Sequence, residues 1–343
     1  MKSKLVTILL FILLLCALTS ACSGLSLVQG DGRTPEATTR SVEIVTATPS
    51  PSPTPTPEPT PEPTPTPVPT PDGLCGGRYD VFTDGEVIET ENSYQTDRIA
   101  LFYEELVWTK EDSPIGKRMY IHICHIYVQD IESFQAFTYR EHTRMKAIAT
   151  KVDAVFAISG DFYAWRDEGL VVRNGEVIRA TVDTYRDICV IYRDGRMESF
   201  ERGHYSADIA QDPDVWHILS FGPILLDEEG RALKQFHTEG VSASGRPVTS
   251  NPGHYATRTA RVGIGYYAPG HYVIVNVEFP GKRSAGIYMT EFAELMESLG
   301  CEKAYNLDGG RTARMWFGNA LRCDGETPER SLLDVLAICR VAP

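Results

Sequence analysis

This chain lacks the histidine and cysteine spacings that are typical of metal-binding sites. Its eight histidines form no HxH or HxxxH pair, and its eight cysteines form no CxxC pair. His122 and His125 lie three residues apart in a strand-like run, so their side chains should point to opposite faces of a sheet. Zinc sites usually draw ligands from such close pairs. Neither a structural zinc site nor another transition-metal site is therefore expected.

Basic residues are a minority, and long apolar runs are scarce. Lys and Arg number 33 against 46 Asp and Glu, and the formal net charge is −13. This balance argues against a nucleic acid as the partner. Beyond residue 21 the chain has no apolar run long enough to span a bilayer, no internal repeat and only one linker-like segment. These absences favour one folded domain.

The first residues have the pattern of an export signal. Two lysines precede the apolar stretch Leu5–Leu18, which is too short to be a membrane span. Small residues then precede Cys22, and this arrangement resembles a bacterial lipoprotein processing box with the usual leucine one place early. We expect residues 1–21 to be a signal peptide and Cys22 to carry lipid. Simple secretion, with Cys22 unmodified, is the alternative.

A proline-rich segment follows. From Pro49 to Pro71, proline occupies every second position. Proline has a fixed φ and no N–H group, so the segment predicts an extended polyproline-II spacer, roughly 70 Å long at about 3.1 Å per residue. Residues 22–72 should therefore hold the following domain away from the bacterial membrane, on the outside of the cell.

Residues 73–343, about 270 in number, fit one large domain. A helical pattern is clearest from Thr290 to Leu299, where Thr290 can cap the start and Gly300 can end the helix. A second helix is expected over Glu141–Lys151. Strand-like runs bounded by turn signals are more numerous. They are 119–127, 154–158, 169–173, 188–192, 262–267 and 272–278.

This pattern predicts an α+β fold, with mixed or antiparallel sheets and a few packed helices in a single domain. Six cysteines belong to the domain once Cys16 leaves with the signal peptide and Cys22 is set aside as the anchor. Export allows disulfides, and buried free thiols are the alternative. The six are Cys75, Cys124, Cys189, Cys301, Cys323 and Cys339.

The stretch Ala304–Ala313 combines a strand-like run, an acid and a glycine turn. Asp308 ends the apolar run, and Gly309 and Gly310 follow it. Glycine permits positive φ and lets a ligand approach main-chain N–H groups closely. The spacing alone favours an ordinary hairpin, because Asp-Gly is a frequent hairpin signal. Asp161 follows a strand-like run in the same way, and capping a turn is its structural alternative.

These motifs, in their order along the chain, resemble the phosphodiester glycosidase family. That family includes the lysosomal enzyme that uncovers mannose 6-phosphate by removing N-acetylglucosamine, and many exported bacterial proteins. The resemblance covers roughly Lys151 to Ile338. The segments that carry it are Ser159-Gly160-Asp161, Phe221-Gly222-Pro223, Arg258-Thr259-Ala260, Ser284-Ala285-Gly286 and Asn306-Leu307-Asp308-Gly309-Gly310.

Several positions depart from the family pattern, among them Thr257 in place of a proline and Tyr288 in place of a threonine. Ser159 replaces an asparagine, and Glu278 stands where relatives carry an Asp-Gly-Arg turn. Arg311 replaces the third glycine after Asp308, and Thr312 replaces the following serine. Arg311 either adds a phosphate contact, narrows the pocket or reflects a different substrate.

The resemblance implies hydrolysis of the glycosidic bond in a sugar-1-phosphodiester, giving free sugar and a phosphomonoester. Asp308 is expected to act as base or nucleophile while Asp161 orients sugar hydroxyls, or the reverse. Arg258 is expected to neutralise the phosphate through its guanidinium group. The remaining substrate-binding candidates are Ser159, Gly160, Gly222, Glu278, Ser284, Gly286, Gly309, Gly310, Arg311 and Thr312.

Two other functions fit the same sequence. A glycan-binding surface lipoprotein would bind saturably and release no product. A metal-dependent phosphodiesterase would cleave the P–O bond and release a sugar phosphate, with a cation on Asp161, Glu278 and Asp308. No cofactor is required by the sequence, and a divalent cation is left open. The expected partner is a glycan or sugar phosphodiester of the cell envelope or the surroundings.

Overall fold

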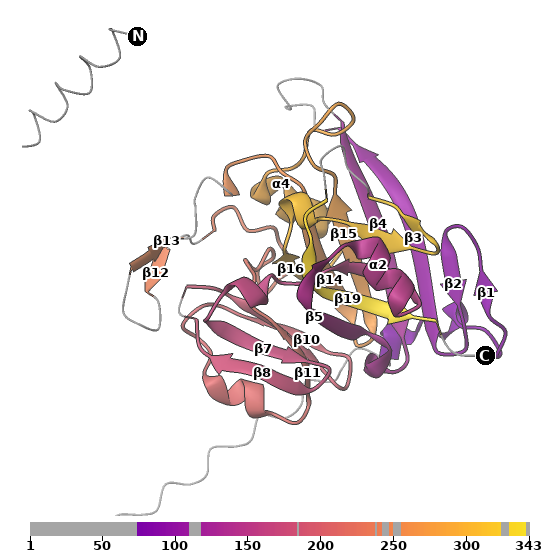
Figure 1. The fold of residues 1–343 in the computed structure, drawn as a ribbon, viewed down its shortest axis with the longest axis horizontal. Coiled ribbons are helices and arrows are strands. Elements are labelled where there is room, and N and C mark those ends of the chain that lie inside the picture. The colour runs from indigo at the N-terminus through magenta and orange to yellow at the C-terminus, as the bar shows by residue number, and fades with distance from the viewer. Residues whose placement is uncertain are drawn as a thin grey trace, which may run out of the picture. The chain divides into compact units, whose positions relative to one another are not determined.

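The computed structural model describes residues 74–109, 118–183, 185–236, 239–241, 247–249, 255–323 and 329–340 (Figure 1). All of them lie in one unit, Pro65–Pro343. The predicted signal peptide, Cys22 and the whole of the proline-rich spacer lie outside the described residues. In the part of the chain that is described, no helix has both the length and the apolarity to cross a bilayer.

The largest sheet has seven strands, and every neighbouring pair in it is antiparallel. The helix α4 (Met289–Ser298) packs on it through Phe292 and Met296. Gly263 leaves room for this helix, because a Cβ there would lie 2.8 Å from Phe292 Cζ. The strand order is β1 (Ile88–Glu89), β2 (Ser93–Gln95), β3 (Ile99–Trp108), β4 (Met119–Val128), β15 (His271–Val277), β14 (Arg261–Ala268) and β16 (Lys303–Leu307).

Two further sheets have five strands each, again antiparallel throughout. One has the order β10 (Met197–Phe200), β9 (Ile188–Tyr192), β11 (Val215–Leu219), β7 (Gly169–Arg173) and β8 (Glu176–Thr181). The other has the order β18 (Ala320–Leu321), β17 (Met315–Phe317), β6 (Ala154–Ser159), β19 (Leu332–Cys339) and β5 (Gln135–Thr143).

Shorter elements complete the described chain. The helix α2 (Met145–Lys151) packs on the sheet of β6, with Ile148 in a cluster that contains Trp316. A two-stranded ribbon joins β12 (Glu239–Val241) to β13 (Pro247–Thr249). Single turns of 3₁₀ helix occur at Leu74–Gly77, Tyr79–Val81, Ile131–Ser133, Tyr163–Trp165, Ala207–Gln211 and Gly310–Thr312.

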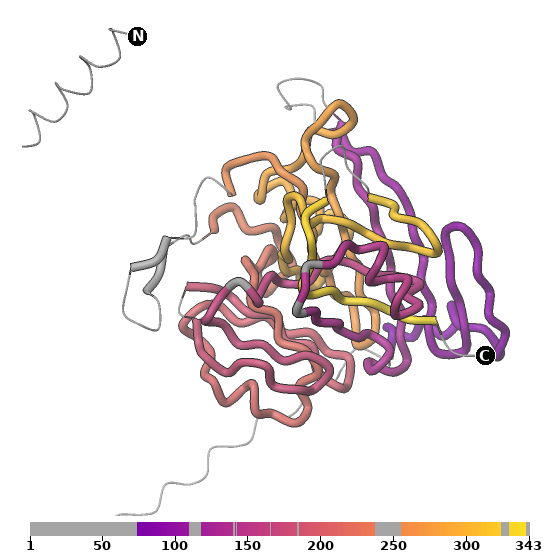
Figure 2. Tube along the Cα trace, in the orientation of Figure 1, coloured from indigo at the N-terminus to yellow at the C-terminus, as the bar shows by residue number. Residues whose placement is uncertain are grey.

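The main core lies where the three large sheets meet. It joins Ile126 of the seven-stranded sheet to Ile191 and Phe156 of the two five-stranded sheets. The two ends of the described chain also come together, as Figure 2 shows for the N-terminal strands and the end of β19. There Arg340 Nη2 lies 2.6 Å from Glu89 Oε1. Segments that are far apart in the described chain therefore contribute to one core.

The predicted α+β class is confirmed, with antiparallel sheets dominating and two α-helices in the described part. The helix expected at Glu141–Lys151 begins only at Met145, because the residues before it continue β5, where Thr143 pairs with Leu332. Thr290 does not cap α4. Tyr288 takes that place, and its N–H donates to Glu291 Oε2 (3.2 Å).

The structure decides between disulfides and free thiols for the cysteines. All six in the described residues are free thiols, five of them buried and Cys339 partly so. Burial raises the pKa of the Cys75 thiol to about 11 and that of Cys301 to about 12. These two are therefore protonated, apolar packing groups at neutral pH.

Candidate active site

Asp308 lies where the chain crosses from one sheet to another. The strand before it, β16, pairs with β14, whereas the strand after it, β17, pairs with β6. The stretch is therefore not the hairpin that spacing alone favoured. Its main chain is joined to the other acid-bearing turn: Asp308 N–H donates to Gly160 O (3.0 Å), and the Ser159 hydroxyl donates to Asp308 O (2.9 Å).

The Asp308 carboxyl group is fixed by a hydrogen bond and has a raised pKa. Thr312 Oγ1 donates to its Oδ2 atom (2.8 Å) from the 3₁₀ turn that follows. Burial raises the pKa of Asp308 to about 7, and the Thr312 hydrogen bond and the cations Arg330 and Arg166 oppose that rise. Near neutral pH both protonation states are populated, which suits a group that moves a proton or attacks as a carboxylate.

Asp308 lines a cavity of about 710 Å³. It is the only acid among the residues described around this space, whereas the cations are numerous: Arg166, Arg186, Arg261, Arg311 and Arg330. Five aromatic side chains line the same space: Phe162, Tyr185, Phe221, Tyr255 and Phe279. The rest of the wall comprises Gly222, Thr259, Ala260, Met289, Asn306, Leu307, Gly309 and Gly310. A positively charged, aromatic cavity around one carboxyl suits an anionic ligand with a ring.

Burial lowers the pKa of two of the cavity arginines. Burial, and then the neighbouring Arg186, lower the pKa of Arg166. Burial lowers the pKa of Arg261 to about 10, although the Ile287 and Thr257 carbonyls accept hydrogen bonds from it. A bound anion would favour the charged guanidinium groups and offset their desolvation. The cavity therefore favours an anionic ligand.

Asp161 lies behind the cavity wall rather than in it. It is fully buried, with Oδ1 2.9 Å from Arg173 Nη2, and Oδ2 accepts from Ser220 N (2.8 Å). Arg173 Nη2 also lies 3.0 Å from Asp334 Oδ2. Burial alone would raise the pKa of Asp161, but Arg173 and Arg166 hold it below its usual value. The carboxylate is therefore an internal ion-pair partner.

This ion cluster shapes the turn that carries Phe162. Gly160 fits because it lacks a side chain, since a Cβ there would lie 1.9 Å from Asp334 Oδ2. Phe162 follows with φ 60°, a left-handed conformation that costs a non-glycine residue about 1–3 kcal/mol. Its ring lies 4.9 Å from the Arg330 guanidinium carbon. The strained turn thus places an aromatic ring and a cation together on the cavity wall.

Arg258 is not among the residues that line the cavity. Its Nη2 lies 2.6 Å from Glu291 Oε1, and its Nη1 donates to Gly286 O (2.9 Å). Its guanidinium group also stacks over the Tyr288 ring at 4.6 Å. Arg258 thus ties the segment before β14 to α4, and Arg261, three residues later, lines the cavity.

The other candidates divide into two groups. Gly222, Gly309, Gly310 and Arg311 line the cavity, although the Gly310 N–H donates to Ala260 O (2.8 Å) and so is not offered to an anion. Six lie behind the wall. Ser159, Gly160 and Thr312 hold the Asp308 turn, Ser284 and Gly286 form the turn before α4, and Glu278 bonds to His122 (2.9 Å).

Sequence reasoning missed four of the five cavity arginines. Nothing local in the sequence marks these four, which are Arg166, Arg186, Arg261 and Arg330. Asn306 was also missed. It is buried in the cavity wall two residues before Asp308, and its Oδ1 has no hydrogen-bond partner among the described residues. Strand alternation would have placed it on the same face as Asp308.

The three acids named for the alternative cation site do not form one group of possible metal ligands in the described residues. Asp161 pairs with Arg173, and Glu278 pairs with His122. Within the described ranges, the only group of at least three possible metal-binding side chains is His122, Glu278 and Cys323.

Comparisons with known proteins place the chain among distant relatives. A family model described as phosphodiester glycosidase matches residues 152–339. The auto-inhibited catalytic domain of zebrafish N-acetylglucosamine-1-phosphodiester alpha-N-acetylglucosaminidase is similar in fold, with a TM-score of 0.52 and 17% identity over 70% of this chain and 84% of that one. A hypothetical protein from Synechocystis has a TM-score of 0.48 and 13% identity, over 71% of this chain and 62% of that one.

One curated relative also matches. The SPbeta prophage-derived uncharacterized protein YomE of Bacillus subtilis (strain 168) is 26% identical over 200 residues, which is 56% of this chain. The match covers only 29% of that protein's length.

Replacing Arg173 with Met should destabilise the protein by about 3–5 kcal/mol, because Asp161 and Asp334 would be left buried without their cation. Urea unfolding measures the change. Arg231→Met is the matched control, since Arg231 is 65% exposed in its ion pair with Asp227 and its loss should change stability little. Equal stability of the two variants would contradict the structural role assigned to Asp161.

Proposed function

Because this chain belongs to the phosphodiester glycosidase family, we propose that it hydrolyses the glycosidic bond of a sugar-1-phosphodiester to give free sugar and a phosphomonoester. The observation that carries this proposal is the cavity, in which five arginines and five aromatic rings surround a single carboxyl group, that of Asp308. Guanidinium groups suit phosphate oxygens, and aromatic rings suit the apolar face of a sugar.

The arginines should stabilise the leaving phosphate group most strongly in the transition state. A phosphodiester carries one negative charge, and the phosphomonoester that leaves the anomeric carbon gains a second. Cations around the phosphate therefore stabilise the transition state more than the bound substrate. Phosphate leaves readily, so strong protonation of the leaving group matters less than in ordinary glycosidases.

Asp308 supplies the carboxylate. It either attacks the anomeric carbon or removes a proton from the attacking water. The Thr312 hydroxyl and the main-chain bonds to the Ser159–Gly160 turn fix its position. Asp161 takes a different role from the one the sequence suggested: it positions Phe162 and Arg166 from behind the wall and does not touch the sugar.

We also propose a cellular location for the enzyme. The sequence pattern of residues 1–72 supports export, lipid attachment at Cys22 and a stiff spacer that holds the domain off the membrane. A substrate of the cell envelope or of the surrounding glycans fits this position. The sugar itself is to be found by screening sugar-1-phosphodiesters with a chromogenic leaving group.

Replacing Asp308 with Asn should lower kcat on such a substrate by about 10²–10⁴-fold, because the carboxylate that attacks or takes the proton is lost. Phosphomonoester and free sugar should be the wild-type products, measured by phosphorus NMR and sugar analysis. Asp194→Asn, at an exposed hairpin turn, is the control and should keep full activity. Saturable binding without product would indicate a glycan-binding protein, and a sugar-phosphate product would indicate P–O cleavage.

The kcat/KM of the wild type should rise with pH through an apparent pKa near 7. Burial raises the pKa of Asp308 to about 7, so the carboxylate needed for the reaction is lost below that pH. Well below it, the rate should fall about tenfold per pH unit. A rate that instead falls as pH rises through 7 would make Asp308 the proton donor and contradict its role as base or nucleophile.

Arg311→Gln should lower kcat/KM about tenfold, mainly through kcat, because the mutation removes a charge-assisted hydrogen bond that strengthens as the phosphate gains its second negative charge. Arg311 is exposed at the cavity wall, so the fold should be kept. Arg196→Gln, at an exposed ion pair outside the wall, is the matched control. An increase in kcat/KM would show that Arg311 only narrows the pocket.

A further inference from the structure

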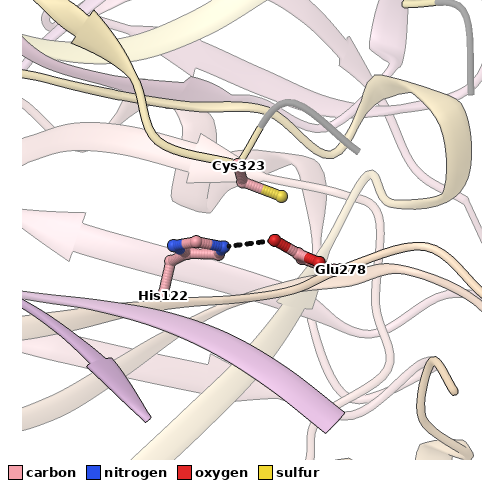
Figure 3. A group of neighbouring side chains, drawn as sticks. All are labelled: His122, Glu278 and Cys323. Atoms are coloured by element: carbon pink, nitrogen blue, oxygen red, sulfur yellow. Dashed lines mark hydrogen bonds and ion pairs between the residues drawn. The ribbon is translucent and has the colours of Figure 1, made fainter. Parts of the chain in front are cut away.

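A second cluster of reactive side chains lies outside the cavity wall. Figure 3 shows the His122 imidazole, the Glu278 carboxylate and the Cys323 thiol converging from three segments of the chain. His122 belongs to β4, Glu278 directly follows β15, and Cys323 follows β18. One ligand atom from each lies within 4.8 Å of the other two, and all three residues are buried.

We propose that this cluster binds a zinc ion through His122, Glu278 and Cys323. Imidazole nitrogen, carboxylate oxygen and thiolate sulfur are the ligand types that zinc accepts together. Magnesium and calcium prefer oxygen ligands alone, and a thiolate disfavours both. The fourth position of the tetrahedron belongs to water.

The distances are close to those of a tetrahedral site. Zinc–nitrogen and zinc–oxygen bonds of about 2.0–2.1 Å and a zinc–sulfur bond of about 2.3 Å put neighbouring ligand atoms about 3.3–3.6 Å apart. His122 Nε2 and Glu278 Oε1 are 2.9 Å apart, and the widest separation in the cluster is below 4.8 Å. Small side-chain rotations, opening the first pair and drawing Cys323 inward, would form the site.

Charge and proton balance are satisfied. One thiolate and one carboxylate neutralise Zn²⁺, so the buried group carries no net charge. The thiol proton leaves to solvent, and the His122 proton moves from Nε2 to Nδ1, where the Tyr103 hydroxyl oxygen, 2.8 Å away, accepts a hydrogen bond from the Nδ1–H group. A ligating histidine usually has such an outer partner. Arg283 Nε, 3.5 Å from Glu278 Oε2, holds the second carboxylate oxygen.

Asn276 supplies an independent indication. It is fully buried, directly opposite His122 in the pairing of β15 with β4. The Cys323 thiol lies 3.5 Å from Asn276 Oδ1, whereas Nδ2 has no hydrogen-bond partner among the described residues. A thiolate needs a donor instead of an acceptor. Turning the amide over would offer Nδ2–H to the sulfur and give this donor a partner.

A nucleophilic role for Cys323 fits less well. A catalytic cysteine needs a histidine nitrogen as its base. Both ring nitrogens of His122 already have partners, Tyr103 on one side and Glu278 on the other. The thiol is also fully buried. The geometry therefore supports a ligand more than a nucleophile.

The ion would join three segments that are distant in sequence. Cys323 Sγ also lies 3.7 Å from Ala313 O, at the end of the turn that follows Asp308. Zinc would thus connect this segment to β4 and β15 and stabilise the fold. Glu105 lies at the entrance, 3.9 Å from His122 Nδ1, with its side chain 40% exposed, and offers the ion a route from solvent.

The test measures metal, so it is independent of glycosidase activity. Full-length protein, loaded with zinc and dialysed against metal-free buffer, should retain one equivalent by mass spectrometry, and a chelator should lower its Tm. Cys323→Ser should weaken zinc affinity by more than about tenfold and remove the effect of the chelator. Cys339→Ser, which changes a cysteine outside the cluster, is the matched control and should bind zinc like the wild type.

A cobalt spectrum of the wild-type protein tests the proposal even if the Cys323→Ser variant does not fold. Wild-type protein loaded with Co²⁺ should show a thiolate-to-cobalt charge-transfer band, and the Cys339→Ser protein should show the same band. Absence of zinc retention, absence of that band, or equal zinc affinity in a folded Cys323→Ser protein would each overturn the proposal and leave a hydrogen-bonded core cluster.

Discussion

One buried guanidinium group, that of Arg173, holds the cavity wall in place. It ends β7 and lies within 3.0 Å of carboxylate oxygens of both Asp161 and Asp334, so it joins the two five-stranded sheets through their charges. A buried ion pair rarely adds stability over well-packed apolar residues, because desolvation offsets most of the attraction. Its value here is geometric: the cluster fixes the turn that carries Phe162 and thereby the shape of the cavity.

The cavity has the opposite charge to the chain as a whole. The formal net charge is −13, yet five arginines meet one carboxyl around the cavity. Charges more than about 8 Å away are largely screened at physiological ionic strength, so the local arginines govern what binds. Two of them, Arg330 and Arg166, also stabilise the Asp308 carboxylate, but burial has the larger effect and leaves its pKa near 7. Desolvation and the nearby cations together keep the Asp308 carboxyl group close to the midpoint of its titration at neutral pH.

Local signals explain how much the sequence could predict. Alternating apolar residues and glycine turns marked the strands and Asp308, because those features depend on neighbours in the chain. The family resemblance pointed to Asp308, which lines the cavity, and to Arg258 and Asp161, which do not. The cavity arginines come from segments between Arg166 and Arg330, and only the packing of three sheets brings them together. His122 and Cys323 escape any spacing rule for the same reason.

The turn after β16 is restrained along its whole length. Ser159 and Gly160 hold the Asp308 main chain, and Thr312 holds its carboxyl. Such restraint suits a reactive group that must not reorganise during the reaction. It also has a cost. A carboxyl whose folded pKa is about 7, above the value of about 3.9 in an unfolded chain, adds most to stability below about pH 4 and loses that contribution as pH rises through 7. The reactive ionised form of Asp308 is therefore the one that the fold tolerates least, and the surrounding hydrogen bonds and cations offset part of that penalty.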